Sequence, residues 1–236
     1  MANLYDKPLK HVGIILDGNR RFAKRLMLKP WKGHEWGAKK IRELLRWCKE
    51  LGIKEVTLFT FSVENFDRPK KEFNYLMNLF EEEFKKTIND PEVYEDKVKF
   101  KFIGRIHMFP ESVQKYMKEL EEKTKNHDNL FVNFAMAYGG RAEILDAAKK
   151  IAEKIEKGEL KAGDVDEKVF EENLYMTSKP DMIIRTSGEK RTSGFLLWQS
   201  DFSEWFFVEK FWPELEKEDF LKCIKEFEKR ERRFGK

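Results

Sequence analysis

Cysteine and glutamine are scarce in this sequence of 236 residues, which contains two of each. The two cysteines, Cys48 and Cys223, are too few for a disulfide scaffold or a cysteine-ligated zinc site. No apolar run approaches the roughly 20 residues needed to span a bilayer, and the first residues lack the order of basic, apolar and small residues of a secretory signal. These absences lead us to expect a cytoplasmic protein.

Charge of one sign is not in large excess either. The chain has 47 Lys and Arg against 43 Asp and Glu, and the two signs are interspersed along most of its helical segments. A general nucleic-acid binder would more often show a basic excess on one face, so we expect local anion sites and no nucleic-acid partner. The 21 Phe, six Trp and six Tyr supply enough apolar area for one core, and we expect residues 1–236 to form a single domain.

Strand and helix patterns alternate along the chain, which is typical of an α/β fold with a central, mostly parallel β-sheet flanked by helices. Short β-branched and aromatic runs predict strands, and apolar residues at helical spacing predict helices. Strands are expected at residues 11–16, 55–62, 98–104, 130–140 and 182–185, with further short apolar runs at 195–198 and 205–208. Helices are expected at residues 37–51, 71–88, 111–125, 142–155, 167–175 and 217–233.

The end of the first expected strand carries the most informative polar residues. In open α/β sheets, ligands bind beyond the carboxyl ends of the strands, where a helix N-terminus favours phosphate. Gly18 would let the backbone approach such an anion, and Arg21 and Arg25 would bind it. Asp17 would repel the same anion unless a Mg²⁺ ion joined the two. The alternative is an ordinary Asp-Gly-Asn turn in which Asp17 caps a helix.

Two further polar segments follow expected strands. Residues 60–69 combine a hydroxyl, an amide, an aromatic ring and a guanidinium, and residues 185–195 combine two arginines with two Ser-Gly steps. The second set suits a diphosphate, although each segment alone could be a surface loop whose side chains bond the local backbone. Glu204 lies in an aromatic context, where a carboxylate needs a metal or an arginine partner. His34 lies near two glycines and is either a phosphate ligand or a structural residue.

The order of these motifs is specific, although each motif alone is modest. The chain contains in succession HVGIILDGNRRFAK, KGHEWGA, TLFTFSVENFDRP, AYGGRAEI, PDMIIRTSGEKRTSGFLLWQSDFSEWFF and RERRFG. This series resembles the cis-prenyltransferase (undecaprenyl diphosphate synthase) family over almost the whole chain. The resemblance implies a homodimeric enzyme that uses Mg²⁺ to add isopentenyl diphosphate repeatedly to an allylic diphosphate primer, with a new cis double bond each time. The long polyprenyl diphosphate, a lipid-carrier precursor, would be delivered to the membrane, so we expect the enzyme to be peripheral at the membrane surface.

The resemblance also implies roles for individual residues. Asp17 matches the catalytic aspartate that holds Mg²⁺, Asn65 matches the residue assigned to proton removal or relay, and Glu204 matches the second metal-associated carboxylate. Matches to the allylic diphosphate site are Gly18, Asn19, Arg20, Arg21 and His34, with Phe22 beside them. Matches to the isopentenyl diphosphate site are Arg68, Arg185, Arg191, Thr192 and Ser193, and matches to the substrate-contacting turn are Ser62, Val63, Glu64 and Phe66.

Five positions depart from the bacterial pattern of that family. Pro30 replaces an arginine that helps to hold the allylic diphosphate, although Lys29 and Lys32 flank it, while Lys190 replaces a histidine near the metal and Gly194 replaces an asparagine. Arg20 and Phe22 replace glycine and tryptophan, as in archaeal and eukaryotic-type sequences. These changes bear on the metal ligands and the primer, and they leave the reaction class intact.

We further expect an apolar tunnel for the growing chain, between the sheet and the helix at residues 73–88. Candidate lining residues, each of which could instead be ordinary core, are Leu76, Phe80, Phe84, Phe102, Phe131 and Phe134. The RERRFG segment at residues 230–235 is expected to complete the active site of the partner subunit. Two alternatives stay open: a non-catalytic subunit of a heteromeric prenyltransferase, and a Mg²⁺-dependent phosphohydrolase that uses Asp17 and Glu204.

Overall fold

A six-stranded β-sheet with the order β3-β4-β2-β1-β5-β6 forms the centre of the protein. The computed structural model describes residues 9–230, and in this part of the chain every strand pairing is parallel. The expected α/β fold is therefore confirmed. The strands are β1 (His11–Ile15), β2 (Glu55–Ser62), β3 (Val98–Ile103), β4 (Leu130–Tyr138), β5 (Met182–Arg185) and β6 (Glu204–Phe207).

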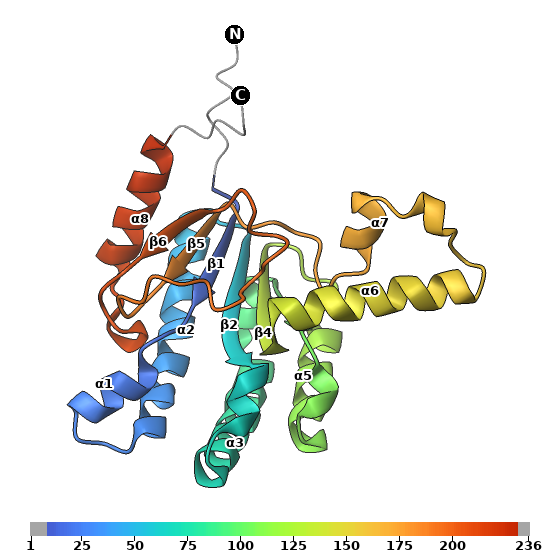
Figure 1. Cartoon of the computed structure of the whole chain (residues 1–236). Coiled ribbons are helices and arrows are strands. Elements are labelled where there is room, and N and C mark those ends of the chain that lie inside the picture. Colours follow the sequence, from blue (N-terminus) through green and yellow to red (C-terminus); the bar gives the residue numbers. More distant parts are fainter. Residues whose placement is uncertain (1–8, 231–236) are drawn as a thin grey trace.

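Helices α2, α3, α5 and α8 cover one face of the sheet, and α6 and α7 project away from it (Figure 1). The covered face forms the main core, in which Val12 and Ile14 of β1 pack with apolar side chains of these four helices. The helices are α1 (Asn19–Arg25), α2 (Gly33–Glu50), α3 (Lys70–Ile88), α4 (Pro91–Glu95), α5 (Glu111–Thr124), α6 (Gly140–Glu156), α7 (Glu167–Glu172) and α8 (Lys217–Lys229). After His11, β1 is a continuous apolar run, as expected for a strand that is buried on both faces.

The opposite face of the sheet is covered largely by the connection between β5 and β6. Phe195 and Leu196 of this connection are fully buried and pack with Ile15 and Ile183. The apolar run at 195–198 is therefore core, but it forms turns and no strand. Left-handed backbone conformations recur along the connection, including φ 48° at Leu196, and they prevent an extended strand.

Several helix boundaries differ from the expected ones, and two short helices were not expected. α2 begins at Gly33, four residues before the expected start, because Gly33 packs directly on α1: a Cβ atom there would lie 1.9 Å from the backbone oxygen of Asn19. The short helices α1 and α4 lack the length for a visible apolar period. Within residues 9–230, no helix has the length and apolar character that crossing a bilayer would require.

Candidate active site

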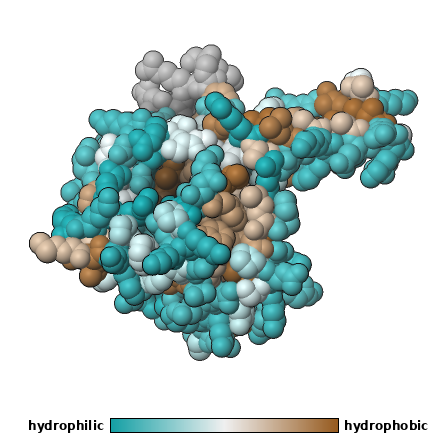
Figure 2. Space-filling view, turned by 60° about the horizontal axis from the view of Figure 1, so that its bottom comes forward, coloured by the Kyte–Doolittle hydropathy of each residue, from teal (hydrophilic) through white to brown (hydrophobic). Residues whose placement is uncertain are grey.

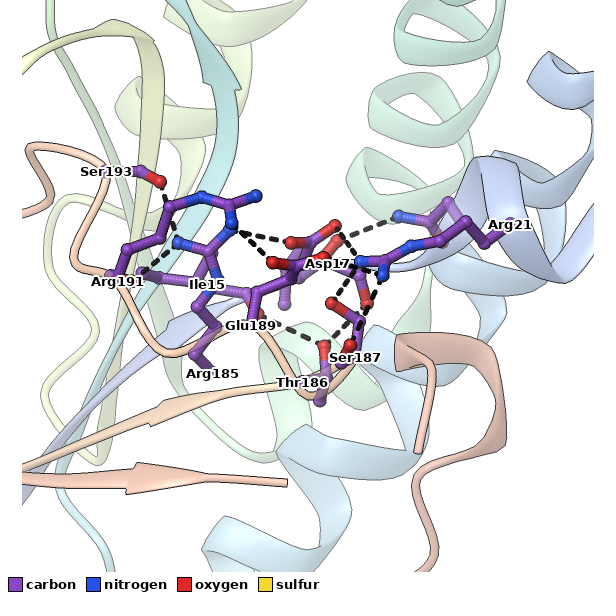
Figure 3. A network of polar contacts seen from close by, with 11 residues as sticks. Ile15, Asp17, Arg21, Arg185, Thr186, Ser187, Glu189, Arg191 and Ser193 are labelled. Carbon is purple, nitrogen blue, oxygen red and sulfur yellow. Dashed lines mark hydrogen bonds and ion pairs between the residues drawn. The ribbon is translucent and has the colours of Figure 1, made fainter. Parts of the chain in front are cut away.

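Asp17 lies just beyond the carboxyl end of β1, beside the last residue of β5. Its Oδ2 atom accepts a hydrogen bond from Nη2 of Arg185 at 2.7 Å, and its Oδ1 atom accepts one from Nη2 of Arg21 at 3.4 Å (Figure 3). β1 and β5 are neighbours, with Ile15 opposite Arg185. The sheet register and the first turn of α1 thus bring one carboxylate and two guanidinium groups together.

The carboxyl group of Asp17 is held in its ionised form. Burial raises the pKa of Asp17, but the hydrogen bond and charge of Arg185, a hydrogen bond from Ser187 and the charge of Arg21 outweigh burial and leave the pKa below its usual value. The side chain keeps 27% of its surface exposed. A partly open, ionised oxygen ligand suits Mg²⁺, which typically binds one or two carboxylates together with substrate phosphates and water.

A metal ion at Asp17 would depend on the substrate for much of its coordination. Within residues 9–230, no group of three or more His, Cys, Asp or Glu side chains is placed to hold a metal. One carboxylate such as that of Asp17 can join a Mg²⁺ ion to bound phosphate.

Arg185 is the most deeply buried charge of this network, with 4% of its side chain exposed. Its Nη1 atom donates to the backbone oxygen of Arg191 at 2.6 Å and to Oγ of Ser193 at 2.7 Å. Its Nε atom is buried and has no partner in the described part of the chain. Since a buried donor without a partner is costly, this N–H is available for a ligand oxygen. Thr192, between these loop residues, is exposed.

Arg21 is held by the same loop from the other side. It donates to Oγ of Ser187 at 2.5 Å and to Oε1 of Glu189 at 2.9 Å. Glu189 also pairs with Arg191, whose side chain is 59% exposed. Ser187 and Glu189 are not among the residues predicted from the sequence, although both lie in the predicted diphosphate segment at residues 185–195.

Gly18 and Asn19 shape the backbone of the site. Gly18 has φ 108°, and a Cβ atom there would lie 2.8 Å from Cβ of Phe211, so no other residue fits without strain. Asn19 is buried and donates from Nδ2 to the backbone oxygen of Leu16 at 2.9 Å. Its Oδ1 atom has no hydrogen-bond partner in the described residues and lies against Gly37 of α2. Asn19 therefore packs α1 against α2 in this structure.

A second group of charges lies between α1, α2 and α3. Nη1 of Arg68 donates to Oε1 of Glu72 at 3.2 Å and lies 3.4 Å from Nε2 of His34, while Nε of Arg20 lies 3.4 Å from the same Glu72 oxygen. Glu72 was not singled out in the sequence, although its position four residues after Arg68 favours a helical ion pair. The structure thus places Arg68 with Arg20 and His34, the residues matched to the allylic site. No described contact joins it to Arg185.

His34 should make the free energy of unfolding depend on pH in a defined window. Burial, followed by the charges of Arg68 and Arg20, lowers the pKa of His34 from 6.5 to about 3. Below pH 6.5 the unfolded chain takes up a proton that the folded chain does not, so stability falls as the pH is lowered toward 3. We expect His34→Gln to flatten the pH dependence measured by denaturant titration. Parallel curves for the variant and the parent chain would contradict this assignment.

The turn after β2 is fixed by a reciprocal cap. The backbone N–H of Ser62 donates to Oδ1 of Asn65 at 3.2 Å, and the Ser62 side chain accepts from the backbone of Asn65. Val63 and Glu64 form the single turn between them. Phe66 packs edge-on against Phe61, with ring centres 5.1 Å apart, and belongs to the apolar core. The amide oxygen of Asn65 is therefore engaged, whereas its NH₂ group has no partner within residues 9–230.

An apolar cavity of about 180 Å³ lies between the sheet, α2 and α3. Asn19, His34 and Arg68 line one end of it, and Lys49 and Asn129 line the other. Of the six expected tunnel residues, Leu76, Phe80, Phe84 and Phe134 line this cavity, but Phe102 and Phe131 do not. Phe102 is buried in the core beside Phe84, and Phe131 is 36% exposed.

Glu204 lies far from Asp17 within one chain. It is the first residue of β6 and pairs in register with Met182 at the start of β5, whereas Asp17 follows the end of β1. Glu204 therefore lies at the amino ends of the strands, and Asp17 lies at their carboxyl ends. Oε2 of Glu204 accepts a hydrogen bond from Nη1 of Arg230 at 2.7 Å, which supplies an arginine partner for this carboxylate. The rest of the RERRFG segment lies outside the described residues.

The residues that depart from the bacterial pattern fit their local backbone and packing. Gly194 adopts φ 75°, a left-handed conformation that asparagine also tolerates, so the exchange of these two residues preserves the backbone. Pro30 begins a short 3-10 helix, a position where its missing N–H costs nothing. Lys190 is exposed in the loop after β5. Phe22 packs edge-on against Trp36, with ring centres 5.8 Å apart.

Comparisons with known proteins agree with this geometry. The undecaprenyl diphosphate synthase family model matches residues 15–235. The chain is 49% identical to a tritrans,polycis-undecaprenyl-diphosphate synthase (geranylgeranyl-diphosphate specific) of Methanocaldococcus jannaschii, over 96% of this chain and 82% of that protein. It is 47% identical to an isoprenyl transferase of Thermus thermophilus, over 96% of this chain and 89% of that protein.

A solved structure gives the same result for the fold. The crystal structure of lavandulyl diphosphate synthase from Lavandula x intermedia, in complex with dimethylallyl diphosphate, superposes with a TM-score of 0.93 and 34% identity. The match covers 97% of this chain and 99% of that one. Sequence motifs, fold and relatives thus converge on one enzyme class, and the chain belongs to the undecaprenyl diphosphate synthase family of cis-prenyltransferases.

Proposed function

We propose that this protein uses Mg²⁺ to condense isopentenyl diphosphate repeatedly onto an allylic diphosphate, with a cis double bond formed at each step. The observation that carries the proposal is the arrangement at the carboxyl edge of the sheet. One charged group surrounds Asp17, a second surrounds Glu72, and the second opens on an apolar cavity. Two diphosphates and one hydrocarbon chain are the ligands that such an edge accommodates.

The two charged groups would hold the two diphosphates, and Asp17 and Arg21 of the first group would also serve the allylic diphosphate. Arg185, Arg191, Thr192 and Ser193 would hold isopentenyl diphosphate, in line with the buried, unpartnered Nε atom of Arg185. Gly18 to Phe22, with His34 and Arg68, would hold the allylic diphosphate beside the cavity. As the allylic C–O bond breaks, negative charge grows on the departing diphosphate, and fixed guanidinium groups stabilise it without reorganisation. A Mg²⁺ ion at Asp17 would neutralise part of the same charge.

The proton released in each condensation would leave near the turn after β2. A neutral amide is a poor base, so we assign to Asn65 an orienting or relay role through its free NH₂ group, with the other turn residues as substrate contacts. Since the relative from Methanocaldococcus jannaschii is named as geranylgeranyl-diphosphate specific, geranylgeranyl diphosphate is our proposed primer. The product would be a long-chain polyprenyl diphosphate, a precursor of lipid carriers.

We also propose a homodimer. α6 projects from the sheet with Leu145 58% exposed, and Leu197, next to the start of α6, is 38% exposed (Figure 1). A second copy would cover these apolar side chains. Arg230 connects Glu204 to the start of the RERRFG segment, and we propose that both serve a diphosphate bound by the partner subunit. The enzyme would work in the cytoplasm and deliver its product to the membrane.

The test is incubation of the purified protein with radiolabelled isopentenyl diphosphate, Mg²⁺ and a panel of allylic primers. We expect label in long-chain products, most rapidly with geranylgeranyl diphosphate, and none in the presence of EDTA. Release of free phosphate without elongation would support a phosphohydrolase. No turnover with any primer would support a non-catalytic subunit.

Residues that line the cavity should control product length. Shortening Leu76, Phe84 or Phe134 to Ala removes side-chain volume from the wall of the cavity and should lengthen the products, at a cost of about 2–5 kcal/mol in stability. Phe131→Ala is the matched control because Phe131 does not line the cavity. Thin-layer chromatography of the dephosphorylated products measures the distribution. An unchanged distribution in all three variants would show that the chain grows elsewhere.

A further inference from the structure

The connection between α1 and α2 exposes three consecutive apolar side chains. Met27 is 96% exposed, and its neighbours Leu26 and Leu28 are 46% and 41% exposed. Met27 also has φ 58°, an uncommon conformation for a residue with a side chain, and it is directed away from the body of the protein. This apolar tip, Leu26–Leu28, protrudes at the lower left of Figure 1 and at the left margin of Figure 2. It contributes little to the core.

Basic residues surround the apolar tip. Residues 20–32 contain six Lys and Arg and no Asp or Glu. Lys24 and Lys29 are exposed and have no ion pair within residues 9–230, whereas the other four cations of the segment pair with acidic side chains. An exposed apolar group with unpaired lysines on both sides complements a surface that is negatively charged outside and apolar beneath.

We propose that the apolar tip docks the enzyme on an anionic lipid surface. Its side chains would enter the boundary between headgroups and acyl chains, and Lys24 and Lys29 would face the lipid phosphates. A protein partner fits less well because a stable interface needs about 800 Å² from each side, and a convex tip of three residues offers much less.

The position of the tip links docking to the proposed function. This link rests on the proposed function, whereas the docking itself does not. α1 begins at the site, and the tip follows its last turn, so both lie on the carboxyl side of the sheet (Figure 1). Docking would hold the site near the lipid phase that receives a long hydrocarbon product. Binding itself requires no turnover, and the two proposals can therefore fail separately.

Vesicle co-sedimentation of the full chain tests the proposal, with phosphatidylcholine alone and mixed with phosphatidylglycerol. We expect binding to the anionic vesicles that weakens with salt, and a loss of about tenfold in partition coefficient for Met27→Asp. Leu51→Asp is the matched control because Leu51, at the other end of α2, is also apolar and 38% exposed. Condensation with a water-soluble primer, measured without vesicles, should be the same for Met27→Asp and the parent.

Three results would overturn the docking proposal. The parent chain may be found only in the supernatant, Met27→Asp may sediment like the parent, or Met27→Asp may instead reduce the oligomer mass, in which case a second copy covers the tip. Absence of condensation by the parent chain would contradict the proposed function and would leave the vesicle result standing.

Discussion

Asp17→Asn is expected to lower kcat by about 10²- to 10³-fold while the protein still folds. The substitution keeps the size of the side chain and removes the charge that would join Mg²⁺ to the allylic diphosphate. Asp17 lies at a strand end and is 27% exposed, so it contributes charge and little packing. Steady-state kinetics at saturating substrates and Mg²⁺ measure the loss, and EDTA should reproduce it in the parent chain.

Stability and a control substitution make this result specific. Asp17→Asn leaves Arg185, with 4% of its side chain exposed, without its carboxylate partner, and an unpaired buried charge destabilises the fold. The variant should therefore melt earlier than the parent but unfold cooperatively. Asp164→Asn, in the exposed loop before α7, should change neither property. Near-normal turnover of Asp17→Asn would show that the catalytic assignment is wrong.

Arg191→Ala should raise the KM for isopentenyl diphosphate by roughly 10- to 150-fold, which corresponds to the loss of one charge-assisted hydrogen bond worth about 1.5–3 kcal/mol. The KM for the allylic primer should stay the same, because Arg191 extends from the loop after β5 with 59% of its side chain exposed. Separate titration of each substrate at saturating concentrations of the other measures the difference.

Arg185→Ala should have a broader effect than Arg191→Ala. Arg185 bonds Asp17, Ser193 and the backbone of Arg191, so its removal disturbs the carboxylate and the loop together. We expect a lower kcat, a higher KM for isopentenyl diphosphate and a lower melting temperature. Lys123→Ala, which breaks a surface ion pair on α5, is the control.

Equal changes in the KM of both substrates for Arg191→Ala would show that the two diphosphate sites are misassigned.

The sheet and the Asp17 side of the site could be predicted from the sequence because parallel topology imposes their geometry. A buried strand is a continuous apolar run, and the polar residue after it must lie at the carboxyl edge. This reasoning applies to Asp17 after β1 and to the loop after β5. The same reasoning does not place Glu204, because the polar residues around it precede a strand. The local sequence pattern alone does not show at which end of a strand a carboxylate lies.

The close contacts between helices could not be predicted from the residue pattern of any one segment. Asn19 is buried against Gly37 because two glycines let α2 approach α1, and the motif alone does not predict this contact. Glu72 reads as a solvated helical charge, yet it is 2% exposed between Arg20 and Arg68. Such placements follow from packing between helices, which no single segment encodes.

The geometry of the double bond formed in one condensation tests the central claim most directly. The parent chain would be mixed with Mg²⁺, one equivalent of geranylgeranyl diphosphate and isopentenyl diphosphate labelled with ¹³C, and the first elongated product would be examined by NMR. We expect a single new double bond of cis geometry, formed only when Mg²⁺ is present. A trans double bond, or a free allylic alcohol with no elongated product, would contradict the assignment of this site to cis condensation.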